Sequence, residues 1–189
     1  NCSIRMAIVQ LVRHGKAAAR FGAHPDPGLD DLGRAQAAAV ANMLNDQHTS
    51  RPKLLSSPLA RAYETAQALA DRWDAPISIE SRVAEIPSPT TNLQARAQWL
   101  SEAMAGNWSA LDDSVQQWRQ ALADFLLSCD SDCIIFSHYV AINAAVGAAM
   151  DDDRMRIFGP DNCSVTTFDN AGGMLRVVEL GKVAETHIN

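Results

Sequence analysis

The sequence lacks any apolar run long enough to cross a lipid bilayer. A membrane-spanning helix needs roughly 20 consecutive apolar residues, and polar side chains interrupt every hydrophobic stretch of this chain well before that length. The residues from Asn1 to Met6 also lack the apolar core and cleavage site of a secretory signal. We therefore expect a cytoplasmic protein that has no membrane partner.

Cysteine is scarce, and its spacing does not favour metal binding. The chain has four cysteines, with no C-x-x-C pair, and only His138 lies near any of them. Zinc sites are usually built from closely spaced pairs of Cys and His ligands. We expect no metal site and interpret the thiols as buried or idle; they are Cys2, Cys129, Cys133 and Cys163.

Positive charge is in deficit. The 16 Lys and Arg residues are outnumbered by 22 Asp and Glu, which gives a net charge of -6. Such a surface repels polyanions at long range, so nucleic acid is excluded as an expected partner. Net charge does not describe a single pocket, however, and a small anion can still bind where a few arginines converge.

Length and composition are those of an ordinary globular domain. The chain has 189 residues, of which 47% are hydrophobic and 20% charged, and one domain typically holds roughly 100–200 residues. We find no internal repeat and no linker. We therefore expect residues 1–189 to form a single domain.

Short apolar runs along the chain predict strands. Residues 6–12 and 133–136 are almost continuously apolar, which is typical of central strands covered on both faces. Residues 53–56 give a weaker third strand. The runs 164–168 and 174–180 flank the turn Asn170-Ala171-Gly172-Gly173 and predict an antiparallel hairpin.

Amphipathic helices are predicted between the strands. Asp30 should cap the first helix and Pro58 should occupy the first turn of the second, while a fifth helix follows His138. This alternation predicts an α/β fold, a three-layer α/β/α sandwich with a mostly parallel central sheet. The expected apolar stripes are Leu32, Ala35, Ala39, Val40, Met43 and Leu44; Leu59, Ala62, Ala66, Leu69, Ala70 and Trp73; Leu93, Ala97, Leu100 and Met104; and Val115, Trp118, Leu122, Phe125 and Leu126.

Unusual polar groups follow three of the predicted strands. Arg13-His14-Gly15 follows the first, Ser56-Ser57-Pro58-Leu59-Ala60-Arg61 the second, and Ser137-His138 the run at 133–136. Ligands of open parallel sheets bind outside the carboxyl ends of the strands. The sequence therefore predicts two Arg and two His side chains at one edge of the sheet.

These segments resemble the histidine phosphatase superfamily, also called the phosphoglycerate mutase-like family. The resemblance is based on four segments that occur in the family's order and span most of the chain. They are Leu11-Val12-Arg13-His14-Gly15, Leu29-Asp30-Asp31-Leu32-Gly33-Arg34-Ala35-Gln36, Ser56-Ser57-Pro58-Leu59-Ala60-Arg61-Ala62 and Phe136-Ser137-His138. A lone R-H-G tripeptide recurs by chance, but the four segments together are specific.

The resemblance implies a role for each matched residue. His14 corresponds to the nucleophile, whose neutral imidazole attacks phosphorus to give a phosphohistidine that water hydrolyses. Arg13, Arg61 and His138 would bind the phosphoryl group, as would the free N–H groups at the helix start beside Arg61. Glu85 is the best match for the general acid; Glu80 and Glu102 are its rivals. The family needs no metal or organic cofactor, and we expect none.

The chain also departs from the family pattern. After R-H-G, many members carry Glu or Gln, a hydroxyl residue and later Asn, whereas this chain has Lys16-Ala17-Ala18-Ala19-Arg20. Lys16 or Arg20 could replace the missing phosphate contacts, although a solvated position is the simpler expectation for both. Residues 21–28 could form a lid over the site or a plain connector.

The predicted activity is hydrolysis of a small phosphomonoester. A protein-phosphohistidine phosphatase, a phosphomutase, and a catalytically weak binding or regulatory module on the same fold remain as alternatives. The oligomeric state is left open.

Outside the motifs, Trp108 is a candidate for substrate contact and residues 151–153 are interpreted as a solvated acidic turn. The remaining histidines, His24, His48 and His187, are expected at ordinary surface or loop positions.

Overall fold

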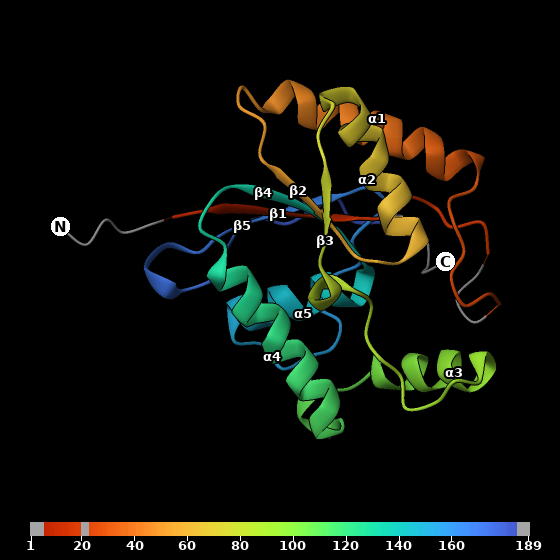
Figure 1. Cartoon of the computed structure of the whole chain (residues 1–189). Coiled ribbons are helices and arrows are strands. Elements are labelled where there is room, and N and C mark those ends of the chain that lie inside the picture. The colour runs from red at the N-terminus through yellow and green to blue at the C-terminus, as the bar shows by residue number, and fades with distance from the viewer. Residues whose placement is uncertain (1–5, 20–22, 185–189) are drawn as a thin grey trace.

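The computed structural model describes residues 6–19 and 23–184 and contains a six-stranded sheet between two layers of helices (Figure 1). The strands lie in the order β3-β2-β4-β1-β5-β6. The first four are parallel to one another, β5 is antiparallel to β1, and β6 is antiparallel to β5. The predicted α/β/α sandwich and the antiparallel hairpin are confirmed. The strand bounds are β1 Ile8–Arg13, β2 Lys53–Ser56, β3 Ile77–Ile79, β4 Cys133–Ser137, β5 Val165–Asp169 and β6 Arg176–Glu179.

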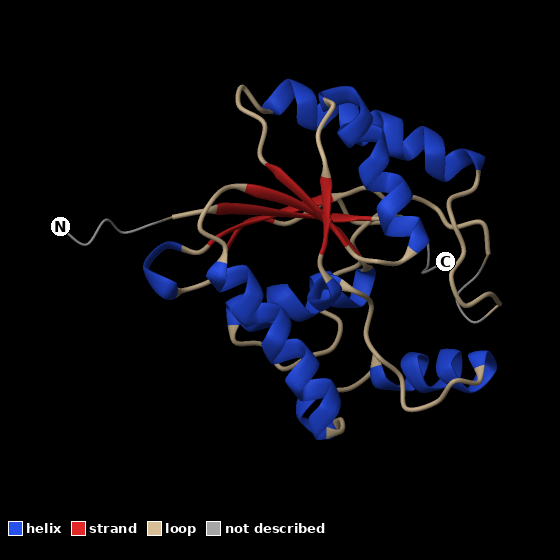
Figure 2. Ribbon diagram, in the orientation of Figure 1, coloured by secondary structure: helices blue, strands red, loops and turns tan. Residues whose placement is uncertain are grey.

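The helices cover both faces of the sheet (Figure 2). Helices α1 and α2 lie on one face, α4 and α5 lie on the other, and α3 stands apart from the sheet at the edge of the second layer (Figure 1). The helix bounds are α1 Asp31–Gln47, α2 Ala60–Trp73, α3 Leu93–Ala103, α4 Asp113–Ser128 and α5 Tyr139–Met150, and the short 3-10 helices are η1 Ser81–Val83, η2 Trp108–Ala110 and η3 Ala171–Gly173. No helix in the described ranges is long and apolar enough to span a membrane.

Strand β1 contributes to a separate core on each face of the sheet. Leu11 belongs to the cluster that packs against α4 and α5, and its neighbour Val12 belongs to the cluster beneath α1 and α2. Both are fully buried. This alternation follows from the two-residue period of a strand, and it explains why the run reads as continuously apolar.

Helix α1 begins as predicted but is rotated about its axis. The Asp30 carboxylate accepts a hydrogen bond from the Gly33 N–H at 2.7 Å, which is the expected cap. Most of the predicted stripe is wrong, because Leu32 is 53% exposed, Met43 is 40% exposed, and Ala35 and Ala39 are exposed as well. A Cβ atom at Gly33 would lie 2.1 Å from the carbonyl oxygen of Lys16, so the helix turns its glycine face inward. The buried residues are Gly33, Ala37, Val40, Ala41 and Leu44.

Helix α2 also differs slightly from the prediction. It begins at Ala60 with Leu59 as the N-cap, so Pro58 precedes the cap instead of lying in the first turn. Proline still suits this position, because its fixed φ and its missing N–H are tolerated in the turn that leads into a helix. Arg61 lies in the first turn, as predicted.

Trp108 does not contact a substrate site, and that prediction is wrong. Its side chain is 1% exposed, and its ring stacks on that of Trp118 at a centroid distance of 6.0 Å. The backbone N–H of Trp108 donates to the Asp153 carbonyl at 2.8 Å. The loop folds onto α4 because a large apolar ring gains more from burial than from solvent exposure.

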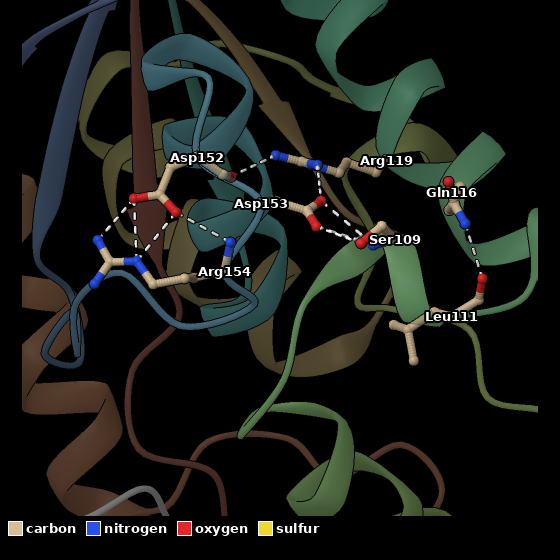
Figure 3. A network of polar contacts seen from close by, with 7 residues as sticks. All are labelled: Ser109, Leu111, Gln116, Arg119, Asp152, Asp153 and Arg154. Carbon is tan, nitrogen blue, oxygen red and sulfur yellow. Dashed lines mark hydrogen bonds and ion pairs between the residues drawn. The ribbon is translucent and has the colours of Figure 1, made fainter.

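The acidic turn after α5 forms a polar network (Figure 3). Asp153 accepts from the Ser109 hydroxyl at 2.6 Å and lies 3.7 Å from an Arg119 guanidinium nitrogen. Asp152 pairs with Arg154 at 2.7 Å, and its carbonyl accepts from Arg119 at 3.0 Å. The turn is therefore fixed to η2 and α4. The described residues contain no group of three or more His, Cys, Asp or Glu that could hold a metal.

Asn170 joins three elements at the end of β5. Its side-chain oxygen accepts from the Ala7 N–H at 2.8 Å. Its side-chain nitrogen donates to the carbonyls of Cys129 at 2.8 Å and Leu126 at 3.1 Å, which lie at the end of α4. Terminal carbonyls of a helix have no partner within the helix. The buried Asn170 amide supplies a hydrogen-bond partner for these carbonyls.

We expect Asn170→Ala to lower the free energy of unfolding by about 2–4 kcal/mol, because it leaves several buried backbone groups without partners. Urea unfolding measures the loss. The matched control is Asn42→Ala on the exposed face of α1, which should change stability by less than about 0.5 kcal/mol. Equal effects of the two substitutions would contradict the assigned role.

Candidate active site

Strand register brings the predicted polar groups to one edge of the sheet. Arg13 at the end of β1 is paired with Ser137 of β4, and Ser56 of β2 is paired with Phe136 of β4. His14 and His138 therefore follow adjacent parallel strands, and their ring centroids lie 5.3 Å apart.

Hydrogen bonds fix the tautomer of His14. Its Nδ1 lies 2.7 Å from the Gly15 carbonyl oxygen, and its Nε2 lies 3.2 Å from Nε of Arg61. A carbonyl oxygen only accepts and a guanidinium only donates. Nδ1 therefore carries the proton, and Nε2 presents its lone pair to Arg61 within the site.

The electrostatic surroundings keep His14 neutral. Burial, together with the nearby positive charges of Arg61 and Arg13, lowers the pKa of His14 to about 3. The side chain is only 6% exposed. At neutral pH the imidazole is therefore uncharged, and its unprotonated nitrogen is Nε2.

Arg13 and Arg61 are buried cations. Their exposed fractions are 4% and 7%, and burial lowers the pKa of both while the Glu85 carboxylate raises it. Arg13 donates to the Pro160 carbonyl at 2.9 Å, and its guanidinium lies 5.2 Å from the centroid of the Tyr139 ring. Within the described part of the chain, neither guanidinium forms an ion pair with a carboxylate. Buried positive charge of this kind favours an anionic ligand.

His138 occupies the N-cap of α5 and is fully buried. Its Nε2 lies 2.8 Å from the Ser57 hydroxyl, which also accepts from the Leu59 N–H at 3.2 Å. Burial lowers the pKa of His138, with further contributions from Arg61 and His14. Among the described residues its Nδ1 has no hydrogen-bond partner.

Glu85 lies in the loop after η1 and faces the start of α5. Its carboxylate accepts from the N–H groups of Ile86 at 3.1 Å, Ala141 at 3.3 Å and Val140 at 3.4 Å. Burial raises the pKa of Glu85, although Arg61 and these N–H groups oppose the shift. A raised pKa suits a carboxyl group that donates a proton near neutral pH.

The two rival carboxylates lie outside the site. Glu80 forms an ion pair with Arg82 at 2.7 Å, and Glu102 accepts from Gln98 at 3.2 Å on the exposed side of α3. Neither lines the cavity that contains Glu85. The geometry thus favours Glu85 among the three.

A cavity of about 650 Å³ adjoins these side chains. Arg13, His14, Arg61 and Glu85 line it, whereas His138 is fully buried and is not among the described lining residues. Volumes of roughly 300–1,000 Å³ are typical of small-molecule sites.

The loop before α1 forms part of the cavity wall. His24, Pro25 and Pro27 line the cavity, and the Asp26 carboxylate accepts from the Ala60 N–H at 2.8 Å at the start of α2. His24 is thus a cavity residue, contrary to the expectation of an ordinary loop position. Residues 20–22, which include Arg20, lie outside the described residues, as does His187.

Lys16 does not reach the phosphoryl-binding groups. Its ammonium lies 3.3 Å from the Asp30 carboxylate, and it is not among the described residues that line the cavity. The alternative in which Lys16 replaces a missing phosphate contact is therefore not supported by its position.

Two supporting residues were not predicted from the sequence. The Thr65 hydroxyl accepts from the Gly15 N–H at 3.0 Å and donates to the Arg61 carbonyl at 2.7 Å, so it ties the His14 loop to α2. The Asn162 side chain donates to the His14 carbonyl at 3.1 Å. Thr65 lies one helical turn after Arg61, and that i, i+4 spacing is the signal that could have identified it.

Glycine allows the loop to approach α1. A Cβ atom at Gly15 would lie 2.6 Å from the Gly33 carbonyl oxygen, a distance that no real side chain tolerates. Gln36, one turn later on α1, accepts from the Lys16 N–H at 2.8 Å. The two matched segments therefore pack backbone to backbone, and this contact positions His14.

The chain belongs to the histidine phosphatase superfamily (branch 1), whose family model matches residues 9–182. Its fold resembles that of phosphoserine phosphatase from Entamoeba histolytica, crystallised with 3-phosphoglyceric acid, with a TM-score of 0.73 and 22% identity over 94% of this chain and 98% of that one. The family resemblance of the four motifs and the phosphoglycerate mutase-like fold are confirmed.

Two sequence relatives carry different names. The chain is 40% identical over 87 residues to glucosyl-3-phosphoglycerate phosphatase of Mycolicibacterium vanbaalenii, which covers 43% of this chain and 37% of that protein. It is 26% identical over 189 residues to a probable phosphoglycerate mutase, GpmB, of Erwinia tasmaniensis, over 87% of this chain and 86% of that protein. The first match thus spans little more than a third of its relative's length.

We expect Thr65→Val to lower the free energy of unfolding by about 1–3 kcal/mol, because the buried Gly15 N–H loses its acceptor while side-chain shape is kept. Thr65→Ser keeps the hydroxyl and should lose less. Chemical denaturation of both variants measures the difference. If Thr65→Ser lowers the free energy of unfolding as much as Thr65→Val does, then packing of the methyl group accounts for the effect, and the hydrogen bonds do not.

Proposed function

We propose that this chain, acting as a single domain, hydrolyses small phosphomonoesters through a phosphohistidine on His14, without a metal or organic cofactor. The observation that carries the proposal is the fixed tautomer of His14, whose unprotonated Nε2 accepts a hydrogen bond from the buried Arg61 and attacks phosphorus once that bond is exchanged for the phosphoryl group. Phosphoryl transfer depends mainly on positioning and on preorganised positive charge. Arg13 and Arg61 provide both.

The reaction proceeds in two steps. The phosphoryl oxygens bind Arg13 and Arg61, which line the cavity; the family resemblance gives His138 the same role, although His138 is fully buried and is not among the described lining residues. His14 Nε2 attacks phosphorus as the bond to the leaving oxygen breaks, and Glu85 donates its proton to that oxygen. The Glu85 carboxylate then takes a proton from water, the water oxygen bonds to phosphorus, and the N–P bond breaks to release phosphate and neutral His14.

The cavity favours a small substrate over a phosphohistidine protein. His14 and Glu85 face a concave space of about 650 Å³, and such spaces enclose small organic groups. A phosphorylated side chain on a protein surface would instead need an open, shallow approach. The alternative of a phosphohistidine-protein substrate predicts the opposite result, namely that such a protein is dephosphorylated faster than any small ester.

The phosphomutase alternative uses the same five residues and differs in its acceptor. A mutase returns the phosphoryl group to a second hydroxyl, and one relative is named a probable phosphoglycerate mutase. Release of inorganic phosphate without isomerised ester distinguishes hydrolysis from this alternative. A weak binding module would give neither product.

We expect His14→Ala to reduce kcat by at least about 10³-fold, because no other group replaces Nε2. Phosphate release from p-nitrophenyl phosphate measures the rate. Rapid quenching of the wild type with a labelled ester should trap acid-labile, alkali-stable phosphate. His48→Ala, which alters a histidine on the C-cap of α1, is the control and should retain activity.

Retention of more than about 1% of the rate by His14→Ala would refute the nucleophile assignment. Label found on Ser, Asp or Cys would point to a different intermediate.

We expect Glu85→Gln to slow alkyl phosphates by ~10²- to 10⁴-fold and p-nitrophenyl phosphate much less, because a basic leaving oxygen needs the proton more. With wild type, the alkyl rate should fall as pH rises through the raised pKa of Glu85, since the acid form is then lost. His14, with its pKa of about 3, should impose no loss above roughly pH 4.

The control is Glu80→Gln, because Glu80 pairs with Arg82 outside the cavity. Its rates and pH profile should match those of the wild type. Equal slowing of both ester types by Glu85→Gln would assign Glu85 a binding or structural role.

A further inference from the structure

Helix α3 has an apolar stripe that the core uses only in part. Leu93, Ala97, Leu100 and Met104 recur at helical spacing, and the sequence predicts that they pack against the sheet. Met104 is buried in the core and Leu100 packs against it, but within α3 itself only Ala103 is buried, and the helix stands away from the sheet (Figure 1). All four stripe residues line the cavity.

Other segments add apolar residues to the cavity lining. Ile86 and Pro87 extend the lining directly from Glu85, while Pro25, Pro27 and Leu59 line it from the segments that precede α1 and α2. Apolar surface left in water costs roughly 25 cal/mol for each Å². A ligand that covers these walls therefore gains free energy in proportion to its own apolar surface.

Two of the hydroxyl groups in the cavity form hydrogen bonds with the backbone of the loop before α3. The Ser88 hydroxyl donates to the Thr90 carbonyl at 2.6 Å, and the Thr90 hydroxyl accepts from the Asn92 N–H at 3.2 Å. These groups stabilise the turn. A polyhydroxylated ligand would have to compete for them.

The aromatic lining is engaged as well. The Tyr139 ring lies 5.2 Å from the Arg13 guanidinium and 6.0 Å from that of Arg156. None of the four tryptophans is among the described lining residues. The site thus lacks, in its described part, the free aromatic platform on which a sugar ring would stack.

We propose that the substrate's organic part is an apolar alkyl or aryl group that lies along the α3 stripe while its phosphoryl group binds at His14. This inference rests on the proposed function and specifies its substrate class. Arg96 and Arg156 also line the cavity, so a second anionic group on the substrate is the competing chemistry that the experiment must exclude.

Binding of n-alkylphosphonates, which cannot be hydrolysed, tests the inference independently of turnover. Titration calorimetry with the ethyl, butyl and hexyl compounds should show affinity rising about fourfold per methylene. The hydrolysed n-alkyl phosphates should show the same trend in kcat/KM, and both hexyl compounds should exceed 3-phosphoglycerate.

Leu93→Gln places a polar amide on the stripe at a residue outside the main core cluster. It should lower the affinity ratio of hexyl- to ethylphosphonate by about tenfold. Leu32→Gln, at an exposed leucine of α1, makes the same chemical change elsewhere and should keep the wild-type ratio. Ala97→Leu places a larger side chain in the cavity, so the alkylphosphonate that binds most tightly should have a shorter alkyl chain than it does with the wild type.

Affinity that is flat or falls with chain length, or a preference for 3-phosphoglycerate that Leu93→Gln leaves unchanged, would overturn the inference. Chain-length-dependent binding without turnover of any ester would leave the apolar site established and refute the proposed hydrolysis instead.

Discussion

The contact between Arg61 and His14 governs the rest of this site. A guanidinium buried beside an imidazole excludes protonation of that imidazole, and it does so only while water is kept away from both. Solvent would screen the charge and allow His14 to titrate near its usual pKa. The neutral state of His14 therefore depends first on burial, and Arg61 adds to that effect.

That requirement explains how the surrounding elements are built. Arg61 is held in the first turn of α2, and the Thr65 hydroxyl one turn later fixes the loop that carries His14. Gly15 and Gly33 allow α1 to close against the same loop at backbone distance. Two helices on one face of the sheet thus enclose the pair, while β1 and β4 supply the rigid base beneath it.

Sequence reasoning identified the parts of the site that depend on strand ends. Arg13, His14 and His138 follow apolar runs, and the parallel register then brings them together without further information. Glu85 comes from a loop, so only resemblance to a family could select it over Glu80. Its position beside the start of α5 depends on tertiary packing that no local pattern encodes.

The errors have a common physical origin. An apolar stripe shows that a helix face avoids water but does not show what covers it, so the α3 pattern cannot distinguish Met104, which is buried in the core, from Leu93 and Ala97, which line the cavity without joining the core cluster. For α1 the stripe was displaced because a backbone contact at Gly33, which carries no hydrophobic signal, sets the rotation of the helix. Trp108 was assigned to a loop, and the loop proved to be folded into the core.

Glu85 is placed where burial raises its pKa against several opposing influences. Burial favours the neutral acid, whereas Arg61 and the N–H groups at the start of α5 favour the carboxylate. In the proposed reaction, a bound phosphoryl dianion offsets the charge of Arg61, so the pKa of Glu85 rises further when substrate arrives. Proton uptake is thereby coupled to substrate binding. Once the leaving group has taken that proton, the same N–H groups stabilise the carboxylate that must activate water, and one side chain can serve as acid and then as base.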